Sequence, residues 1–149
     1  MNSMLVFKKQ VNKIFKSNKS LLEKYCEYLD LLYPETSIQG WNLYDADPID
    51  KDVYEECKHF FEVFFNFLEN INHSFTYKDF PLNPVADNSL QFETENDTHY
   101  IEIQIYKNKC TIYVNLYFDT KDEQHISKEF HNKEDGYKEF IYYINQYFI

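Results

Sequence analysis

The chain has 149 residues, of which 44% are hydrophobic and 19% aromatic, and its formal net charge is −10. This length fits a single domain over 1–149, and the apolar content is too high for a disordered chain. All 15 basic residues are lysines, against 25 acidic residues. Because nucleic-acid recognition favours arginine and a basic face, this balance argues against a nucleic-acid partner and favours a basic protein partner. Solubility alone is the competing explanation for the charge.

The three cysteines, Cys26, Cys57 and Cys110, are far apart in the sequence, and each lies among apolar residues. This pattern is typical of buried free thiols in a reducing compartment. The first residues lack the long apolar core of a signal peptide, and no stretch reaches the ~20 apolar residues of a membrane helix. We therefore expect a cytoplasmic protein with no membrane partner.

Apolar residues recur at helical spacing in four segments of the chain. Residues 4–16 predict a short helix or an ordered arm. A second helix is expected to begin after Ser20, which fits an N-cap, and to end before Pro34, because the residue before proline disfavours helical backbone. The longest apolar stripe predicts a helix over 51–71, and the last helix is expected over 134–148. The pattern thus indicates three to four helices.

Three further segments alternate apolar and polar residues with period two, which predicts strands over 90–95, 98–107 and 110–119. Asn96-Asp97 and Asn108-Lys109 are the predicted tight turns, because Asn tolerates a positive φ. Both turns place the same apolar set on one face of the sheet. The pairs expected opposite each other are Leu90 with Ile103, Phe92 with Ile101, Ile101 with Leu116, Ile103 with Val114, and Ile105 with Ile112.

These elements predict an α+β fold, in which an antiparallel meander of three to four strands packs with three to four helices. The helical N-terminal part is expected to cover 1–72, and the sheet with the C-terminal helix to cover 73–149. Residues 81–88 are expected to be extended, and 120–132 to form a polar loop. The sequence therefore indicates one domain with helices first and the sheet second.

Local motifs for catalysis or phosphate binding are missing from the sequence. The chain has two glycines, Gly40 and Gly136, too few to build a phosphate-binding loop or a nucleophile elbow. His125 and His131 flank Glu129, a pattern that can bind a metal, but solvated loop histidines are the preferred interpretation. We expect no catalytic residue, no metal and no cofactor. A small hydrolase or metal-dependent enzyme that uses His125, His131 or buried carboxylates remains the alternative.

The second face of the predicted sheet is the first candidate binding surface. It carries tyrosines among carboxylates and amides, a composition that contacts protein at modest entropy cost. Helices covering this face, or a plain solvated sheet that favours tyrosine by strand propensity, are the alternatives. The residues predicted to bind a partner here are Glu93, Tyr100, Glu102, Tyr106, Tyr113 and Tyr117.

The linker before the longest helix, residues 40–50, is the second candidate surface. It holds the only tryptophan, Trp41, followed by Tyr44 and a run of acids, and we predict that Trp41, Tyr44, Asp45, Asp47 and Asp50 contact a basic partner. The alternative is structural. In that case the aromatic residues anchor the loop to the core, and Asp47 or Asp50 caps the following helix.

The run Gly40-Trp41-Asn42-x-Tyr44-x-Ala46-x-Pro48-Ile49 resembles a G-W-[DN]-x-Y-x-A-x-P-[IV] motif of small uncharacterised bacterial proteins from mobile-element or defence neighbourhoods. As in that family, a helix and then a P-x-[VI] strand region, here at Pro84-Val85, follow the motif. The likeness covers about 40–117, with Asn42 where Asp is common and Asp45 where Gly is common. The resemblance implies a genomic context and no reaction, and it favours an antitoxin, immunity or anti-defence role.

Charge, motifs and resemblance together favour a non-enzymatic acidic binding protein that inhibits or neutralises a bacterial toxin or a nucleic-acid-acting effector. The acidic linker and the tyrosine-rich sheet face are expected to cover a basic site on that partner. A self-associating scaffold subunit is a further alternative beside the enzyme, and a homodimer is left open.

Overall fold

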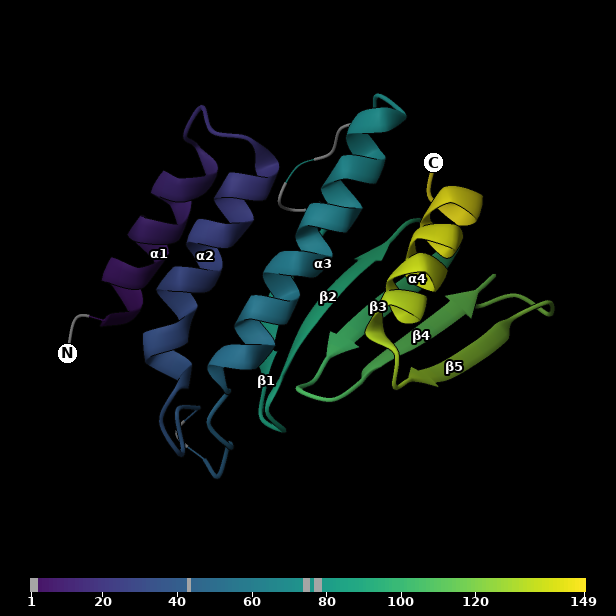
Figure 1. The fold of residues 1–149 in the computed structure, drawn as a ribbon. Coiled ribbons are helices and arrows are strands. Elements are labelled where there is room, and N and C mark those ends of the chain that lie inside the picture. The colour runs from purple at the N-terminus through teal and green to yellow at the C-terminus, as the bar shows by residue number, and fades with distance from the viewer. Residues whose placement is uncertain (1–2, 43, 74–75, 77–78) are drawn as a thin grey trace.

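The computed structural model describes residues 3–42, 44–73, 76 and 79–149, and these residues form four helices and one five-stranded sheet (Figure 1). The fold is α+β, as the sequence predicted. The elements are α1 (Ser3–Phe15), α2 (Leu21–Thr36), α3 (Lys51–Asn70), β1 (Leu82–Val85), β2 (Ser89–Glu95), β3 (His99–Ile105), β4 (Cys110–Leu116), β5 (Gln124–Phe130) and α4 (Lys133–Tyr147).

The sheet is an antiparallel meander in the order β1-β2-β3-β4-β5, with five strands where three to four were expected. The three predicted strands are present, and the extended segment after Pro81 forms β1. The fifth strand, β5, lies inside the predicted polar loop 120–132. Its side chains are exposed or half-buried, and only Ile126 and Phe130 are apolar, so the usual alternation of a half-buried strand is weak.

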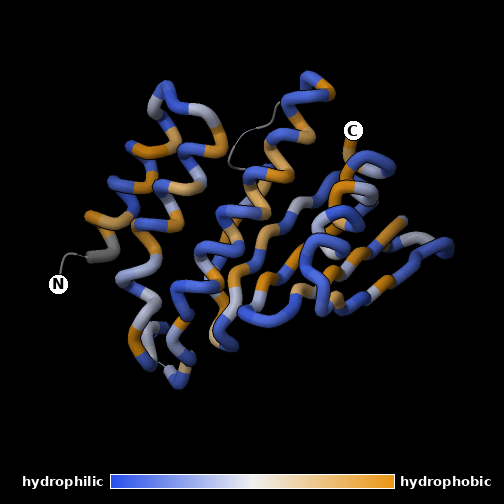
Figure 2. Tube along the Cα trace, viewed as in Figure 1, coloured by the Kyte–Doolittle hydropathy of each residue, from blue (hydrophilic) through white to orange (hydrophobic). Residues whose placement is uncertain are grey.

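Helices α3 and α4 cover one face of the sheet, and α2 lies beside α3, followed by α1 (Figure 1). Along β3 and β4 every second side chain is buried against these helices. Figure 2 shows the corresponding alternation of hydrophobic and hydrophilic positions along the strands. The ring of Phe92 lies at the centre of this core, with ring centroids of Phe60, Phe61, Phe64 and Phe80 within 5.7 Å of its own.

Both hairpins have a register two residues away from the predicted one. Phe92 faces Ile103, and Ile103 faces Ile112. The expected positive φ at Asn96 and Asn108 is absent. Instead, the Asn96 side-chain oxygen accepts hydrogen bonds from the backbone N–H of Thr98 at 3.0 Å and of His99 at 2.7 Å, so Asn96 opens the turn and does not occupy its centre. A shift of two residues keeps every side chain on its face, and the predicted core face is therefore correct.

Helix α2 continues through Pro34 to Thr36, three residues beyond the predicted end. Proline in the last turn removes one backbone donor and leaves carbonyls without their usual partners. Side-chain hydroxyls satisfy other carbonyls of this last turn, because Thr36 donates to the carbonyl of Leu32 at 3.1 Å and Ser37 to the carbonyl of Pro34 at 3.2 Å. The helix can therefore absorb the proline at its end.

Gly136 in α4 lies against β4 and β5. A Cβ atom at this position would overlap the Cys110 sulfur and press on the ring of Phe130. Glycine lowers the intrinsic stability of a helix, but the close packing at this position leaves no room for a larger residue. In the described part of the chain, no helix is long and apolar enough to cross a membrane.

Candidate functional site

The second face of the sheet carries no helix in the described structure (Figure 1). We call it the open face. Its side chains are mostly half-buried by one another and polar, and they alternate with the core residues along each strand. The open face comprises Gln91, Glu93, Glu95, Tyr100, Glu102, Gln104, Tyr106, Thr111, Tyr113, Asn115, His125, Ser127 and Glu129.

Tyr117, predicted on this face, lies elsewhere. Its φ is +54°, which turns the chain at the end of β4. Its ring packs on that of His99 at a centroid distance of 4.7 Å, and His99 in turn contacts Tyr147 of α4. Period-two alternation placed Tyr117 on the open face, but the alternation stops where the backbone enters the left-handed region.

Two carboxylates and a phenol form the centre of the open face. Glu93 and Glu102 lie directly opposite each other on β2 and β3. The Tyr100 hydroxyl donates to Glu93 and lies 3.2 Å from Glu102, and Gln91 donates its amide to Glu93 at 2.9 Å. Burial raises the pKa of the Glu102 carboxyl, and the negative charge of Glu93 raises it further. The hydrogen bond from Tyr100 lowers this pKa, but its effect is smaller than that of burial. Burial and Glu93 also raise the pKa of Tyr100.

A second hydrogen-bond network lies where the open face meets the turn between β1 and β2. The Tyr106 hydroxyl donates to Asp87 at 2.8 Å, and the Ser89 hydroxyl donates to the same carboxylate at 2.6 Å. Gln104 donates to the Ser89 oxygen at 2.9 Å. Burial, together with Asp87, raises the pKa of Tyr106 to about 12. Tyr106 therefore stays neutral and holds its ring at the edge of the face.

A third network lies on β4 and β5. The Tyr113 hydroxyl is 2.6 Å from His125 Nδ1, and His125 Nε2 is 3.1 Å from Glu123. Glu129 pairs with Lys109 at 2.7 Å. A backbone N–H and then His125 lower the pKa of Glu123. These pairs leave the face with more acids than bases.

The histidines of the enzyme alternative are not brought to one centre. His125 bonds to Tyr113 and Glu123, whereas His131 lies 3.5 Å from Glu129 beyond the end of β5. Within the described residues no group of three or more histidine, cysteine or carboxylate side chains is placed to hold a metal ion. The thiols of Cys57 and Cys110 are buried, and burial raises the pKa of Cys110 to about 12.

The linker folds back on itself through its polar side chains. Trp41 is half-buried, and its indole N–H donates to the Asp47 carbonyl at 2.8 Å. The Asn42 oxygen accepts from the backbone N–H of Tyr44 at 3.0 Å and of Ala46 at 3.3 Å. Trp41 thus anchors the loop, as the structural alternative expected. The ring of Tyr44 remains 81% exposed, which leaves it available to a partner.

Asp50 occupies the N-cap position of α3, but its carboxylate makes no capping hydrogen bond. It lies 3.7 Å from the Lys107 amine and 3.4 Å from the Asn88 side-chain nitrogen. Asp45 and Asp47 are exposed. The acids of the linker therefore lie largely at the surface.

The turn between β1 and β2 brings the two predicted surfaces together. The Asp47 N–H donates to the Ala86 carbonyl at 2.9 Å, and the Asp50 N–H donates to the Asn88 side chain at 2.9 Å. The residue between them in this turn, Asp87, receives the Tyr106 hydroxyl from the open face. Sequence reasoning missed Asp87, because it lies beyond the strand alternation. The linker and the open face form one continuous acidic surface across this turn.

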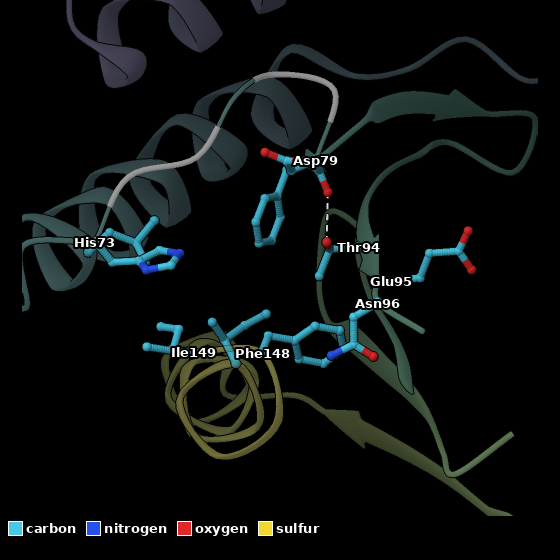
Figure 3. Close-up of a pocket in the computed structure, with 10 residues that line it drawn as sticks. His73, Asp79, Thr94, Glu95, Asn96, Phe148 and Ile149 are labelled. Carbon is cyan, nitrogen blue, oxygen red and sulfur yellow. Dashed lines mark hydrogen bonds between the residues drawn. The ribbon is translucent and has the colours of Figure 1, made fainter. Parts of the chain in front are cut away.

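A cavity of about 240 Å³ lies between the ends of α3, β2 and α4 (Figure 3). His73, Thr94 and Phe148 surround it, and the Thr94 hydroxyl donates to the Asp79 carbonyl at 2.6 Å. The Asp79 carboxylate already accepts from Thr76 at 2.8 and 3.0 Å. The cavity lining is therefore engaged in local structure, and the open face is the stronger candidate site.

Comparison of the chain with protein-family models, with curated proteins and with solved structures finds no match. The open face and the linker are therefore the features of the chain from which a function can be inferred.

Proposed function

We propose that this chain is a non-enzymatic binding protein that inhibits or neutralises a basic bacterial toxin or nucleic-acid-acting effector. The observation that carries the proposal is the sheet face that no described helix covers, where carboxylates and tyrosine hydroxyls are held by hydrogen bonds to one another. Such an array steers a basic partner by charge and contacts it through pre-ordered rings. The free cysteines fit action in the cytoplasm.

The linker extends this surface. Tyr44, Asp45 and Asp47 are exposed beside the turn that carries Asp87, so a partner seated on the open face reaches them as well. Long-range attraction by the net charge of −10 speeds the encounter, and it weakens as salt screens the charges.

The test is capture from a native bacterial lysate at low salt, with the wild-type chain and two variants of equal net charge. The first variant neutralises the open face by Glu93→Gln, Glu95→Gln and Glu102→Gln. The matched control neutralises three exposed acids on α2 and α3 by Glu35→Gln, Glu62→Gln and Glu69→Gln.

We expect a basic protein to bind the wild type and the control, to bind the open-face variant at least tenfold more weakly, and to dissociate as salt rises. Mass spectrometry identifies that protein, and its own activity is then measured with and without this chain. Equal capture by both variants, or an unchanged activity of the captured protein, contradicts the proposal.

A further inference from the structure

The two edges of the sheet differ in whether their backbone groups find hydrogen-bond partners within the chain. The edge at β1 is closed, because Pro84 has no N–H and three carbonyls along the edge accept hydrogen bonds from α2 or the linker. These bonds join Phe80 O to the Tyr25 hydroxyl at 2.6 Å, Leu82 O to the Tyr28 hydroxyl at 3.4 Å, and Ala86 O to the Asp47 N–H at 2.9 Å.

The edge at β5 is open. In Figure 1, β5 is the outermost strand and no helix lies beyond it. Tyr106 and Lys109 form a hydrogen-bonded pair at the hairpin, with an N···O distance of 2.9 Å, and this sets which residues of β4 bond to β3 and which bond to β5. Residues that bond to one neighbouring strand alternate with residues that bond to the other. When this alternation is followed from β4 to β5, the backbone N–H and C=O groups of His125, Ser127 and Glu129 point away from the sheet. Among the described residues, none hydrogen-bonds to these outward groups.

The sequence of β5 is complementary to itself in one antiparallel register. When Ser127 faces Ser127 of a second copy, each histidine on the open-face side stands opposite a glutamate. The opposed pairs are Glu123 with His131 and His125 with Glu129, each formed twice about the two-fold axis. A histidine opposite a carboxylate can donate a hydrogen bond to it across the antiparallel pair, whereas like charges opposed across the pair destabilise it.

The neighbouring registers lack this property. A shift of two residues in one direction opposes Glu123 with Glu129, and a shift in the other direction opposes His125 with His131. A shift of one residue would place open-face side chains opposite core-side ones. The pairing of glutamate with histidine therefore favours the register centred on Ser127.

Lysines on an edge strand commonly prevent such pairing. Lys128, the lysine of β5, lies on the helix side of the strand, where its amine contacts both carboxylate oxygens of Glu139 in α4 at 3.2 and 3.3 Å. The Lys128 side chain is therefore directed toward α4 and does not block the outer edge of β5.

We propose that β5 pairs with β5 of a second copy of this chain, antiparallel about a two-fold axis through Ser127, so that two five-stranded sheets join into one. The contact uses the outward backbone groups of His125, Ser127 and Glu129, and it makes the two open faces continuous. It does not depend on the proposed inhibitory function. Because each copy has a net charge of −10, the association is expected to be weak and dependent on concentration.

The first test measures mass by sedimentation or light scattering from micromolar to millimolar chain. We expect the wild type to shift from monomer to dimer, and Ser127→Pro to remain a monomer, because the outward N–H is lost while the ladder to β4 is kept. Ser127→Ala keeps the N–H and is expected to dimerise like the wild type. A wild type that stays monomeric throughout, or a Ser127→Pro dimer, overturns the proposal.

The second test fixes the register and does not require the proline variant to fold. Two Ser127 Cα atoms would lie ~5.5 Å apart in this pairing, within the range of a disulfide, so Ser127→Cys should give a covalent dimer on mild oxidation. Gln124→Cys is the matched control, because its two copies would lie ~20 Å apart along the strands. The wild type controls for the native thiols, of which Cys26 is half-buried and the others are buried. Failure of Ser127→Cys to cross-link, or equal cross-linking of Gln124→Cys, contradicts the proposal.

Discussion

Glu93 and Glu102 face each other directly across β2 and β3, so two carboxyl groups share the middle of the open face. Like charges opposed on adjacent strands destabilise a sheet by ~0.2–1 kcal/mol relative to neutral pairs. This destabilising pair lies on a face that no described helix covers. Such a pair is expected where a surface is retained for binding rather than for stability.

Replacing one of the two carboxylates is expected to stabilise the fold. Glu102→Gln removes the like-charge contact and gives Glu93 a neutral amide neighbour, so the free energy of unfolding at neutral pH should rise by about 0.2–1 kcal/mol. Urea denaturation measures it. Glu95→Gln, an exposed acid at the end of β2 that faces Tyr100, is the control and should change little. A clear loss of stability in Glu102→Gln would contradict this interpretation.

The raised pKa of Glu102 predicts a pH dependence of definite sign. The group titrates at its ordinary value of 4.5 in the unfolded chain and at a higher value in the folded protein. Between the two values the folded state binds more protons, so stability falls as pH rises above 4.5 through the folded pKa. The advantage of Glu102→Gln over the wild type should therefore grow with pH. Unfolding free energies of both proteins between about pH 4 and about pH 7 measure the difference, and a constant or shrinking difference would disprove the assignment.

Gly136→Ala is expected to destabilise the protein, although alanine is the better helix former. The new Cβ would overlap the Cys110 sulfur, and such overpacking costs about 1–3 kcal/mol, more than the ~1 kcal/mol gained in helix propensity. Thermal and urea unfolding measure the effect. Cys110→Ala provides the space, so the double variant should be more stable than the sum of the two single changes predicts. Strict additivity would show that the two side chains do not meet.

Asn96 is expected to contribute through two separable sets of hydrogen bonds. Its oxygen accepts from the backbone of the turn, and its nitrogen donates to the Tyr147 carbonyl of α4 at 2.9 Å. Asn96→Ala loses both sets and should cost about 1–2 kcal/mol, whereas Asn96→Asp keeps the acceptor and should cost roughly half as much. Equal losses in chemical denaturation would mean that the turn contacts contribute nothing. Hydrogen exchange at His99 should increase only in the alanine variant.

The sequence by itself determined which residues form the core. Period-two alternation assigned Phe92, Ile103 and Ile112 to one face, and helical spacing predicted the apolar stripes of α3 and α4. These predictions hold although both registers were displaced, because a displacement by two residues leaves each side chain on the same side of the sheet. The order of apolar and polar residues along the chain indicates which residues are buried. This order can be read from the sequence without knowing which residues of neighbouring strands pair.

Tertiary structure alone decided the register, the fifth strand and the shape of the acidic surface. The turn at Asn96 depends on where its side-chain oxygen finds donors, and β5 is a strand because β4 offers it an edge, since its own apolar pattern is weak. The linker joins the open face through Asp87, which lies about forty residues from Asp47 in the sequence. Polar contacts of this kind depend on the distance and direction between individual atoms, and hydropathy along the chain does not encode them.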